Sequence, residues 1–279
     1  MGERKVDFMI IGAMKSATTS LHAYLNQHPR IFLSNPKETD FFIEEKNLSK
    51  GLDWYHGLFK NADQSQLLGE ATTSYTKLPD FTGVAERIYK YNDKVKLIYL
   101  VRNPIERAIS HYRHSQGFGR VDLPFEKEIR QDISKYVQYG RYSYQIYEYL
   151  KYFDKNQILI VQSEKLISQP KQTLAEILEF LGLDSISIDV SGVFNNSQEK
   201  TKRTKFNKIL RENVFIKVFK RLTPRFVTTA YLKLTEKKLP NLMITPDDEI
   251  FLKTKFKEDV NTLMDEFHLD LNYWPQWEN

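Results

Sequence analysis

Cysteine is absent from this chain of 279 residues. Its absence excludes disulfide bonds, thiol catalysis and thiolate metal ligands, and it agrees with a reducing compartment. The chain also lacks any apolar run near the roughly 20 residues that a membrane-spanning helix needs. Its first residues lead directly into a strand pattern and lack the apolar stretch of a signal peptide. We therefore expect a cytoplasmic protein without a transmembrane segment.

Acidic residues are scarce in one part of the chain. Between Lys200 and Arg225 there are ten lysines and arginines but one acidic residue, Glu212. The net charge of the whole chain is +5, so the other residues together carry −4. Such local basicity favours an anionic ligand at one place over general nucleic-acid binding. A membrane-surface helix, a lid over the anion and a solvated helix packed on the body remain the three alternatives for this segment.

Strand and helix patterns alternate through the first 180 residues. Apolar runs predict strands at 8–12, 31–34, 67–70, 94–101 and 157–161. Helical spacing predicts helices at 18–26, 51–59, 81–91, 104–115, 125–132, 134–153 and 170–181, and an acidic-capped helix from 246 to about 267. This alternation is typical of an α/β fold with a central, mainly parallel sheet flanked by helices. We predict one domain, with a core at 1–192, a basic and partly helical covering segment at 193–245, and a closing helix at 246–279 that packs on the core.

The stretch 8–25 predicts an anion site. A buried strand, a short turn and a helix entered through hydroxyl residues leave free backbone N–H groups and the positive end of a helix dipole at one spot. Lys15 lies in that turn, with Thr18, Thr19 and Ser20 at the start of the helix. A strand-to-helix turn with a surface lysine is the simpler alternative.

Missing glycines exclude two common nucleotide motifs here. The NTPase pattern, counted from Gly12, needs a glycine and a lysine at the positions of Ala17 and Thr18, and the lysine of this chain lies three places early. The dinucleotide fingerprint needs a second and a third glycine after Gly12, which the chain does not have.

Three further stretches carry polar residues next to predicted strands. The strand at 94–101 ends at Arg102, and a helix capped by Asn103 follows, so that Arg102 and Ser110 could both contact a second anionic group; a structural salt bridge is the alternative for Arg102. Paired phenylalanines should anchor a loop that carries Glu38, for which a solvated carboxylate is the alternative. The turn 70–75 should face the same crevice as Lys15 because ligands lie beyond the carboxyl ends of parallel strands.

Together these motifs resemble those of sulfotransferases that use 3′-phosphoadenosine 5′-phosphosulfate (PAPS), particularly bacterial members related to heparan sulfate and Golgi carbohydrate enzymes. The resemblance covers nearly the whole chain and implies a P-loop-like fold. Residues 12–21 are similar to the family's 5′-phosphosulfate loop, 37–42 (Lys-Glu-x-x-Phe-Phe) to its loop with the catalytic base, and 102–112 to its 3′-phosphate motif. The Gly140-x-Tyr142-x-x-Gln145 piece and the closing helix with a terminal tryptophan also match.

The resemblance implies a role for each of the matched residues. Lys15 would neutralise charge on the bridging oxygen, and Glu38 would take the proton of the acceptor hydroxyl. No metal is required. The 5′-phosphosulfate would be bound by Lys15, Ser16, Ala17, Thr18, Thr19 and Ser20, and the 3′-phosphate by Arg102 and Ser110, with Tyr142 nearby and Lys200, Lys202 or Arg203 closing over the nucleotide.

Two residues depart from the family pattern. Ala17 stands where the family usually has glycine, and its methyl group is expected to fit if the local φ is negative. Ala71 replaces a lysine that some heparan-type members carry, so the sequence does not support heparan as the acceptor. A hydroxyl on a saccharide, a glycolipid or a small metabolite is expected instead. A kinase or NTPase of similar fold, and a non-enzymatic module that binds polyanions or membranes through 200–225, are the alternative functions.

Overall fold

The computed structural model describes residues 4–121, 123–191, 201–202, 237–238 and 242–277. Its central sheet has five strands in the order β2-β3-β1-β4-β5, and every neighbouring pair is parallel. The strands are β1 Phe8–Gly12, β2 Ile31–Leu33, β3 Leu67–Ala71, β4 Lys96–Val101 and β5 Ile158–Gln162. The predicted parallel α/β architecture is thus confirmed. A short antiparallel pair, β6 Thr201–Lys202 and β7 Lys237–Lys238, is separate from this sheet.

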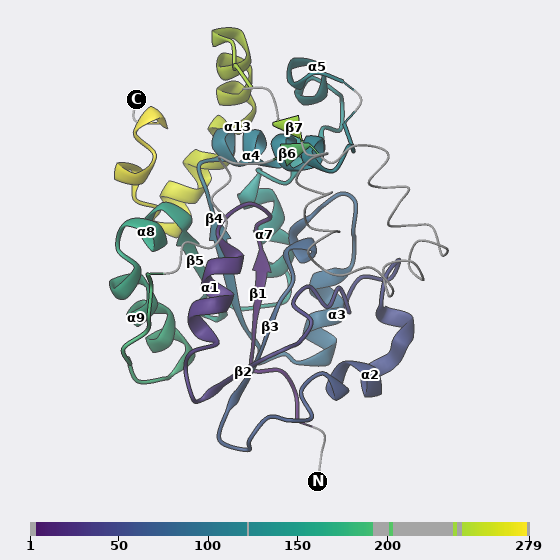
Figure 1. Ribbon diagram of the computed structural model, residues 1–279, viewed down its shortest axis with the longest axis vertical. Helices are drawn as coiled ribbons and strands as arrows, with labels where there is room; N and C mark the ends of the chain where they lie inside the picture. The colour runs from purple at the N-terminus through teal and green to yellow at the C-terminus, as the bar shows by residue number, and fades with distance from the viewer. Residues whose placement is uncertain (1–3, 122, 192–200, 203–236, 239–241, 278–279) are drawn as a thin grey trace.

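Helices cover both faces of the sheet (Figure 1). Before β4 the chain forms α1 Thr18–Leu25, α2 Gly51–Gly57 and α3 Val84–Tyr91, and the 3₁₀ helices η1 Leu48–Lys50 and η2 Thr73–Thr76. After β4 follow α4 Pro104–Gly117, α5 Phe125–Ile129, α6 Lys135–Gln138, α7 Tyr142–Leu150, η3 Lys155–Gln157, α8 Ser163–Ser168 and α9 Pro170–Leu181. The chain closes with α13 Pro246–Phe267, η4 Leu271–Tyr273 and η5 Pro275–Trp277.

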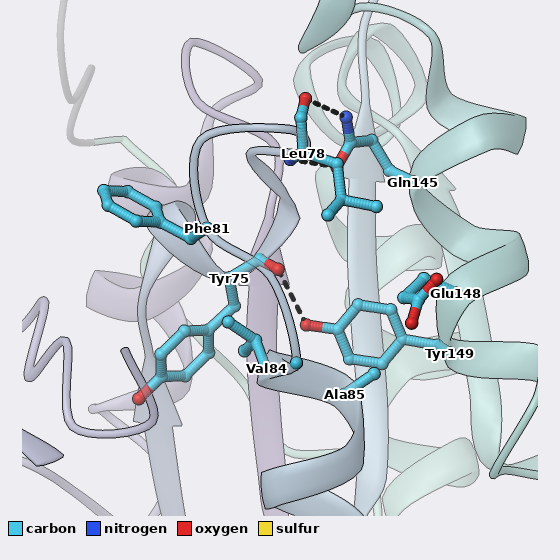
Figure 2. Close-up of a pocket in the computed structure, with 9 residues that line it drawn as sticks. Tyr75, Leu78, Phe81, Val84, Ala85, Gln145, Glu148 and Tyr149 are labelled. Carbon is cyan, nitrogen blue, oxygen red and sulfur yellow. Dashed lines mark hydrogen bonds between the residues drawn. The ribbon is translucent and has the colours of Figure 1, made fainter. Parts of the chain in front are cut away.

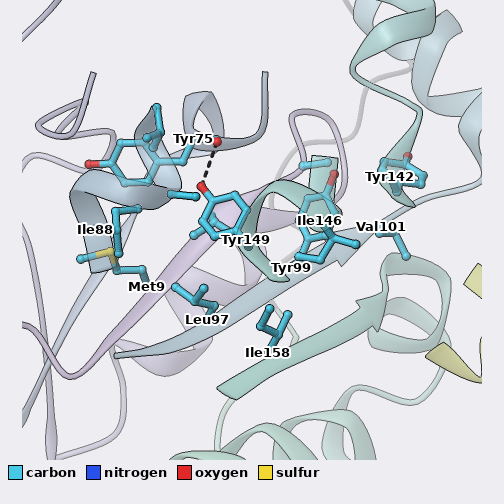
Figure 3. Packing of buried hydrophobic residues seen from close by; sticks show 14 of the residues in the cluster. Met9, Tyr75, Ile88, Leu97, Tyr99, Val101, Tyr142, Ile146, Tyr149 and Ile158 are labelled. Carbon is cyan, nitrogen blue, oxygen red and sulfur yellow. Dashed lines mark hydrogen bonds between the residues drawn. The ribbon is translucent and has the colours of Figure 1, made fainter. Parts of the chain in front are cut away.

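Alternate residues of each central strand enter two different cores, as expected for a sheet that is covered on both faces. Phe8 and Ile10 of β1 pack with α1, α8 and α9. Met9 of β1 and Leu97 of β4 pack on the other face with α3, α7 and α13, and Figure 3 shows this layer, in which Ile146 and Tyr149 of α7 lie over the strands.

The predicted helix 134–153 is wrong, because the chain forms α6 and α7 with a break between them. The carbonyl of Tyr136 accepts a hydrogen bond from the Arg107 guanidinium, which comes from α4. Gly140 donates its N–H to Val137 instead, at 2.9 Å. A Cβ at Gly140 would lie 3.1 Å from Nε of Arg107 and 3.0 Å from the ring of Phe256. The buried arginine therefore takes a carbonyl that a continuous helix would use, and glycine leaves room for it.

The closing helix α13 forms where it was predicted and begins with a capping box. The Thr245 side chain accepts from the N–H of Asp248, whose carboxylate accepts from the N–H of Thr245. Asp259 of the same helix accepts from the N–H groups of Tyr142 and Ser143 at 2.7 and 3.0 Å. These bonds satisfy the uncapped start of α7 and tie it to α13.

Candidate active site

The turn between β1 and α1 forms as predicted. Ala13 donates its N–H to the Leu100 carbonyl on β4 at 2.7 Å, which fixes the turn to the sheet. A Cβ at Gly12 would lie 2.0 Å from Oγ1 of Thr76, so only glycine fits there. α1 starts at Thr18 without a side-chain cap. Its first backbone N–H groups therefore remain available to an anion.

Ala17 precedes α1 with a φ of 61° and a ψ of 17°, in the left-handed region. The methyl group of Ala17 was expected to fit if this φ were negative, but the φ is positive. The methyl group instead packs against the core beneath α1. Lys15 also has a positive φ, of 76°. The turn thus has two non-glycine residues in a backbone conformation that costs an L-residue about 1–2 kcal/mol.

The hydroxyl residues of this stretch lie at and just before the first turn of α1. Ser16, Thr18 and Ser20 are buried, whereas Thr19 is half-buried. Lys15 is half-buried too. Hydroxyl groups and a lysine thus surround the start of α1, where the helix N-terminus favours an anion.

Glu38 lies beyond the carboxyl end of β3 and is held there by several bonds. Its N–H donates to the Ala71 carbonyl at 2.9 Å. Its Oε2 accepts from the backbone N–H of Thr73 at 2.8 Å and from the Thr73 hydroxyl at 3.0 Å, and its Oε1 accepts from Nζ of Lys37 at 2.5 Å. About a third of the side chain is exposed. A carboxylate has about four lone-pair sites, so this one is fixed in position and can still accept a proton from a ligand.

The start of α1 and the Glu38 loop lie at the same end of two paired strands, because β1 leads into α1 and pairs in parallel with β3, whose last residue accepts the N–H of Glu38. His22 of α1 lies one turn after Thr18, and its pKa is lowered to about 4 by burial and by the charge of Lys37, against the opposing charge of Glu38. An imidazole on α1 therefore senses both charged groups of the loop. The predicted phosphosulfate turn and the predicted base come together at one edge of the sheet.

The second predicted anion site lies at the start of α4. The Asn103 side chain caps the helix by accepting from the N–H groups of Ile105 and Glu106. The Arg102 guanidinium forms a salt bridge with Glu106 at 2.7 Å, which was the alternative expected for Arg102. Both side chains are partly exposed, and salt bridges between exposed side chains are weak. Oγ of Ser110 is buried without a hydrogen-bond partner among the described residues. An unpaired buried hydroxyl and an arginine held by an exchangeable ion pair, on the same helix start, are groups that suit a phosphate.

Tyr142 connects the second site to the first. It is fully buried, donates its hydroxyl to the Arg102 carbonyl at 2.7 Å and accepts the Arg102 N–H at 3.3 Å. Burial raises the pKa of Tyr142, and the Ser16 hydroxyl beside it opposes that shift. Tyr142 therefore supports the backbone of Arg102, because its hydroxyl is bonded to both the carbonyl and the N–H of that residue.

The three predicted covering residues cannot all be placed. Lys200 and Arg203 lie outside the described residues. Lys202 belongs to β6, which lies against α4, and only its backbone is described. Within the basic stretch 200–225 the structure describes residues 201–202, and these lie next to α4, the predicted 3′-phosphate helix.

Two lysines that were not singled out from the sequence contact the residues that flank Glu38 and Thr73. Nζ of Lys46 lies 2.8 Å from a carboxylate oxygen of Asp40 and 3.2 Å from Oγ of Ser74, and Lys77 donates to the same Oγ at 3.1 Å. Burial and the neighbouring Lys46 lower the pKa of Lys77. Nothing local in the sequence distinguishes Lys46 or Lys77 from surface lysines.

Thr73 and Arg107 were also not identified from the sequence. The turn 70–75 was predicted to face the crevice, and Thr73 does so, but Glu70 is fully buried in the core. Arg107 is fully buried, and its pKa is lowered by that burial. It lies on α4, between Arg102 and Ser110 in the sequence, and its guanidinium donates to the carbonyl of Tyr136.

The described part of the chain contains no group of three His, Asp or Glu residues arranged to hold a metal ion. None of its helices is long and apolar enough to cross a bilayer.

Comparison with known proteins points to one family. The model of the sulfotransferase domain family matches residues 5–222. Heparan sulfate glucosamine 3-O-sulfotransferase 5 of Mus musculus is 32% identical over 186 residues, which are 63% of this chain and 53% of that protein. The human bifunctional heparan sulfate N-deacetylase/N-sulfotransferase 2 is 28% identical over 201 residues, 65% of this chain and 22% of that protein. The chain thus spans about half the length, or less, of these curated relatives.

Solved structures show the same fold. A sulfotransferase from Alicyclobacillus acidocaldarius superposes with a TM-score of 0.70 at 24% identity, over 98% of this chain and 99% of that one. A mouse sulfotransferase in complex with PAP, the 3′,5′-bisphosphate of adenosine, superposes with a TM-score of 0.56 at 14% identity, over 99% of this chain and 90% of that one.

Proposed function

The chain belongs to the sulfotransferase domain family, and we propose that it transfers a sulfuryl group from PAPS to an acceptor hydroxyl. The observation that carries the proposal is that the uncapped start of α1 and Glu38 lie at the same end of two paired strands, because α1 follows β1, β1 pairs in parallel with β3, and Glu38 donates its N–H to the last residue of β3, Ala71. Sulfuryl transfer needs an anion site and a base on the two sides of one sulfur atom.

The turn before α1 binds the 5′-phosphosulfate in this proposal. Backbone N–H groups at the helix start and the hydroxyls of Ser16, Thr18 and Thr19 face the anion. Lys15 carries the positive charge that neutralises the bridging oxygen as the bond between sulfur and that oxygen breaks. PAP is the leaving group.

Glu38 acts as the general base. Its carboxylate accepts the proton of the acceptor hydroxyl while the acceptor oxygen forms its bond to sulfur. Thr73 holds one carboxylate oxygen in place with two hydrogen bonds. Such positioning of a base contributes typically 10²–10⁴ in rate.

Arg102 and Ser110 bind the 3′-phosphate and so distinguish PAPS from ADP-type nucleotides. The unpaired, buried Ser110 hydroxyl supports this assignment. A bidentate contact from Arg102 to phosphate replaces its exposed pair with Glu106. The covering role of Lys200, Lys202 and Arg203 belongs to the proposal on the resemblance alone, since only Lys202 lies in a described element.

The acceptor is proposed to be a hydroxyl of a saccharide, a glycolipid or a small metabolite. The names of the curated relatives support a saccharide, and the lysine missing at Ala71 counts against heparan. Lys46 and Lys77 place positive charge on the acceptor side of Glu38. A kinase or NTPase is disfavoured because the Gly-Lys-Ser/Thr pattern is missing.

Radiolabelled PAPS incubated with a panel of hydroxyl acceptors tests this proposal. Transfer of label, together with a mass increase of one sulfonate on an acceptor, is the expected result. A Lys15→Ala protein is the matched control, and its transfer rate should collapse. Equal transfer by this variant would refute the role of Lys15, and γ-phosphate transfer from ATP in place of sulfuryl transfer would refute the proposal.

A further inference from the structure

Glu70 of β3 is a fully buried carboxylate whose side-chain partners in the described structure are hydroxyl groups. Oε1 accepts from the hydroxyls of Thr39, Thr72 and Tyr75, the last two at 2.7 and 2.6 Å. Oε2 accepts from the hydroxyl of Tyr55. Burial raises the pKa of Glu70 and these four hydrogen bonds oppose the shift. Burial of a carboxylate is costly, and the four hydroxyl donors offset that cost.

Three of these hydroxyls also hold the backbone of the base loop, defined here as residues 37–42. Each accepts one N–H from that loop. The pairs are Thr72 with Asp40 at 3.4 Å, Thr39 with Phe41 at 3.3 Å and Tyr75 with Phe42 at 3.3 Å. Three consecutive N–H groups of the loop are therefore bound through hydroxyls that donate to one carboxylate.

The carboxylate decides the direction of these hydrogen bonds. A hydroxyl has one proton, and its position rotates to suit the strongest acceptor. Because an ionised carboxylate only accepts, Glu70 draws the protons of all these hydroxyls toward itself. The lone pairs of Thr39, Thr72 and Tyr75 are then left to face the loop N–H groups. An apolar side chain at position 70 would leave each hydroxyl free to turn.

The base loop needs such a hold because its backbone is strained. Glu38 and Asp40 have positive φ values of 62° and 51°. Such conformations are costly for residues other than glycine, and they persist where the surroundings over-determine them. Thr39, which donates to Glu70, lies between the two. Relaxation of either residue would turn the Glu38 carboxylate away from Thr73.

We propose that Glu70 is a positioning residue for the reaction: through the hydroxyls of Thr39, Thr72 and Tyr75 it holds the base loop in the conformation that presents the Glu38 carboxylate to the acceptor. This inference rests on the proposed function, because it takes Glu38 to be the base. Glu70 itself is fully buried and touches neither substrate.

Tyr55 and Tyr75 offer a matched pair of variants. Both rings are buried and both hydroxyls donate to Glu70, but only the Tyr75 hydroxyl also accepts a loop N–H. The backbone of Tyr75 is held independently, because Tyr149 donates to its carbonyl at 2.9 Å, and Figure 2 shows the Tyr75 ring pointing away from that bond. Tyr75→Phe therefore removes the link to the loop without freeing η2.

The expected result separates kcat from donor binding. For Tyr75→Phe we expect kcat to fall about tenfold, the equivalent of one such hydrogen bond, with the Kd for PAP within threefold of wild type. For Tyr55→Phe the fall should be less than threefold. Equal losses of kcat in the two variants, or an unchanged kcat in Tyr75→Phe, would overturn the inference.

Glu70 itself is tested with a conservative and an apolar substitution. Glu70→Gln keeps an acceptor for three hydroxyls and should retain more activity than Glu70→Leu, whose kcat should fall about a hundredfold with the Kd for PAP little changed. Asp248→Asn is the control for lost stability, because Asp248 is buried and belongs to the cap of α13. The two variants are compared at the same loss of Tm. If kcat then falls as much in Asp248→Asn as in Glu70→Leu, Glu70 has a structural role only.

Amide hydrogen exchange distinguishes failure of this inference from failure of the proposed function. The N–H groups of Asp40, Phe41 and Phe42 should exchange at least fivefold faster in Tyr75→Phe than in Tyr55→Phe, whatever reaction the protein catalyses. Unchanged exchange would overturn the hold of Glu70 on the loop. If Tyr75→Phe shows this faster exchange but the wild-type protein shows no PAPS-dependent transfer, the proposed function is refuted and the hold of Glu70 on the loop stands.

Discussion

Thr73 donates two hydrogen bonds to the same carboxylate oxygen of Glu38. Its backbone N–H and its hydroxyl donate to Oε2 at 2.8 and 3.0 Å, across 35 residues of sequence. Thr73 begins η2 directly after β3, so its position is set by the sheet. The direction of the Glu38 carboxylate is therefore fixed by the core of the fold, although Glu38 itself lies in a loop.

Glu38→Gln should abolish turnover and leave the nucleotide site intact. Glutamine keeps the size of the side chain but cannot accept the acceptor's proton, so kcat should fall by about 10²–10⁴. The Kd for PAP, measured by calorimetry, should stay within a few-fold of wild type. Loss of both together would contradict the assignment of Glu38 as the base.

Thr73→Val should weaken catalysis without removing the base. Valine keeps the shape and the backbone N–H of Thr73 but loses the hydroxyl, and a hydrogen bond to a charged group is worth about 1.5–3 kcal/mol. We expect kcat to fall about tenfold with the Kd for PAP unchanged. Thr73→Ser retains the donor and should stay within about threefold of wild type. A serine variant as impaired as the valine variant would assign the effect to packing.

Ala17→Gly should stabilise the protein. Glycine adopts the φ of 61° without steric cost, which relieves about 1–2 kcal/mol, and the greater freedom of the unfolded chain offsets about 0.5–1 kcal/mol of that. The expected rise in Tm is about 2 °C. Ala108→Gly, within α4, is the control and should lower Tm. A lower Tm for Ala17→Gly would mean that the packing of its methyl group outweighs the strain.

The folding stability of the protein should decrease as the pH falls from 6.5 toward 4 in part because of His22. Its pKa in the folded protein is lowered to about 4, so the unfolded chain binds more protons in this range and stability rises with pH. His22→Gln removes this contribution. The Tm of wild type should therefore fall more steeply than that of the variant between pH 6.5 and 4.5. Parallel Tm curves would show that His22 is not shielded from protonation.

The strands and the capped helices could be predicted from the sequence because their signals are local. The apolar runs of β1 and β4, the Asn103 cap and the Thr245 capping box each lie within a few residues of the element they define. The order of the motifs along the chain also identified Lys15 and Glu38 as the candidate pair.

Features that depend on distant residues could not be predicted. The break after α6 arises because Arg107 binds the Tyr136 carbonyl across 29 residues. The support of Glu38 by Thr73 and the positive φ of Ala17 likewise depend on how the chain packs. Hydrophobic periodicity carries no information on such contacts.

Discrimination between PAP and ADP tests the central claim most directly, because it requires no knowledge of the acceptor. The proposed second anion site consists of the buried Ser110 hydroxyl and Arg102, and only a 3′-phosphate would reach it. By isothermal titration calorimetry, wild-type protein should bind PAP at least tenfold more tightly than ADP, and Ser110→Ala should lose most of that preference while its affinity for ADP stays the same. Equal affinity of the wild-type protein for PAP and ADP would contradict the account.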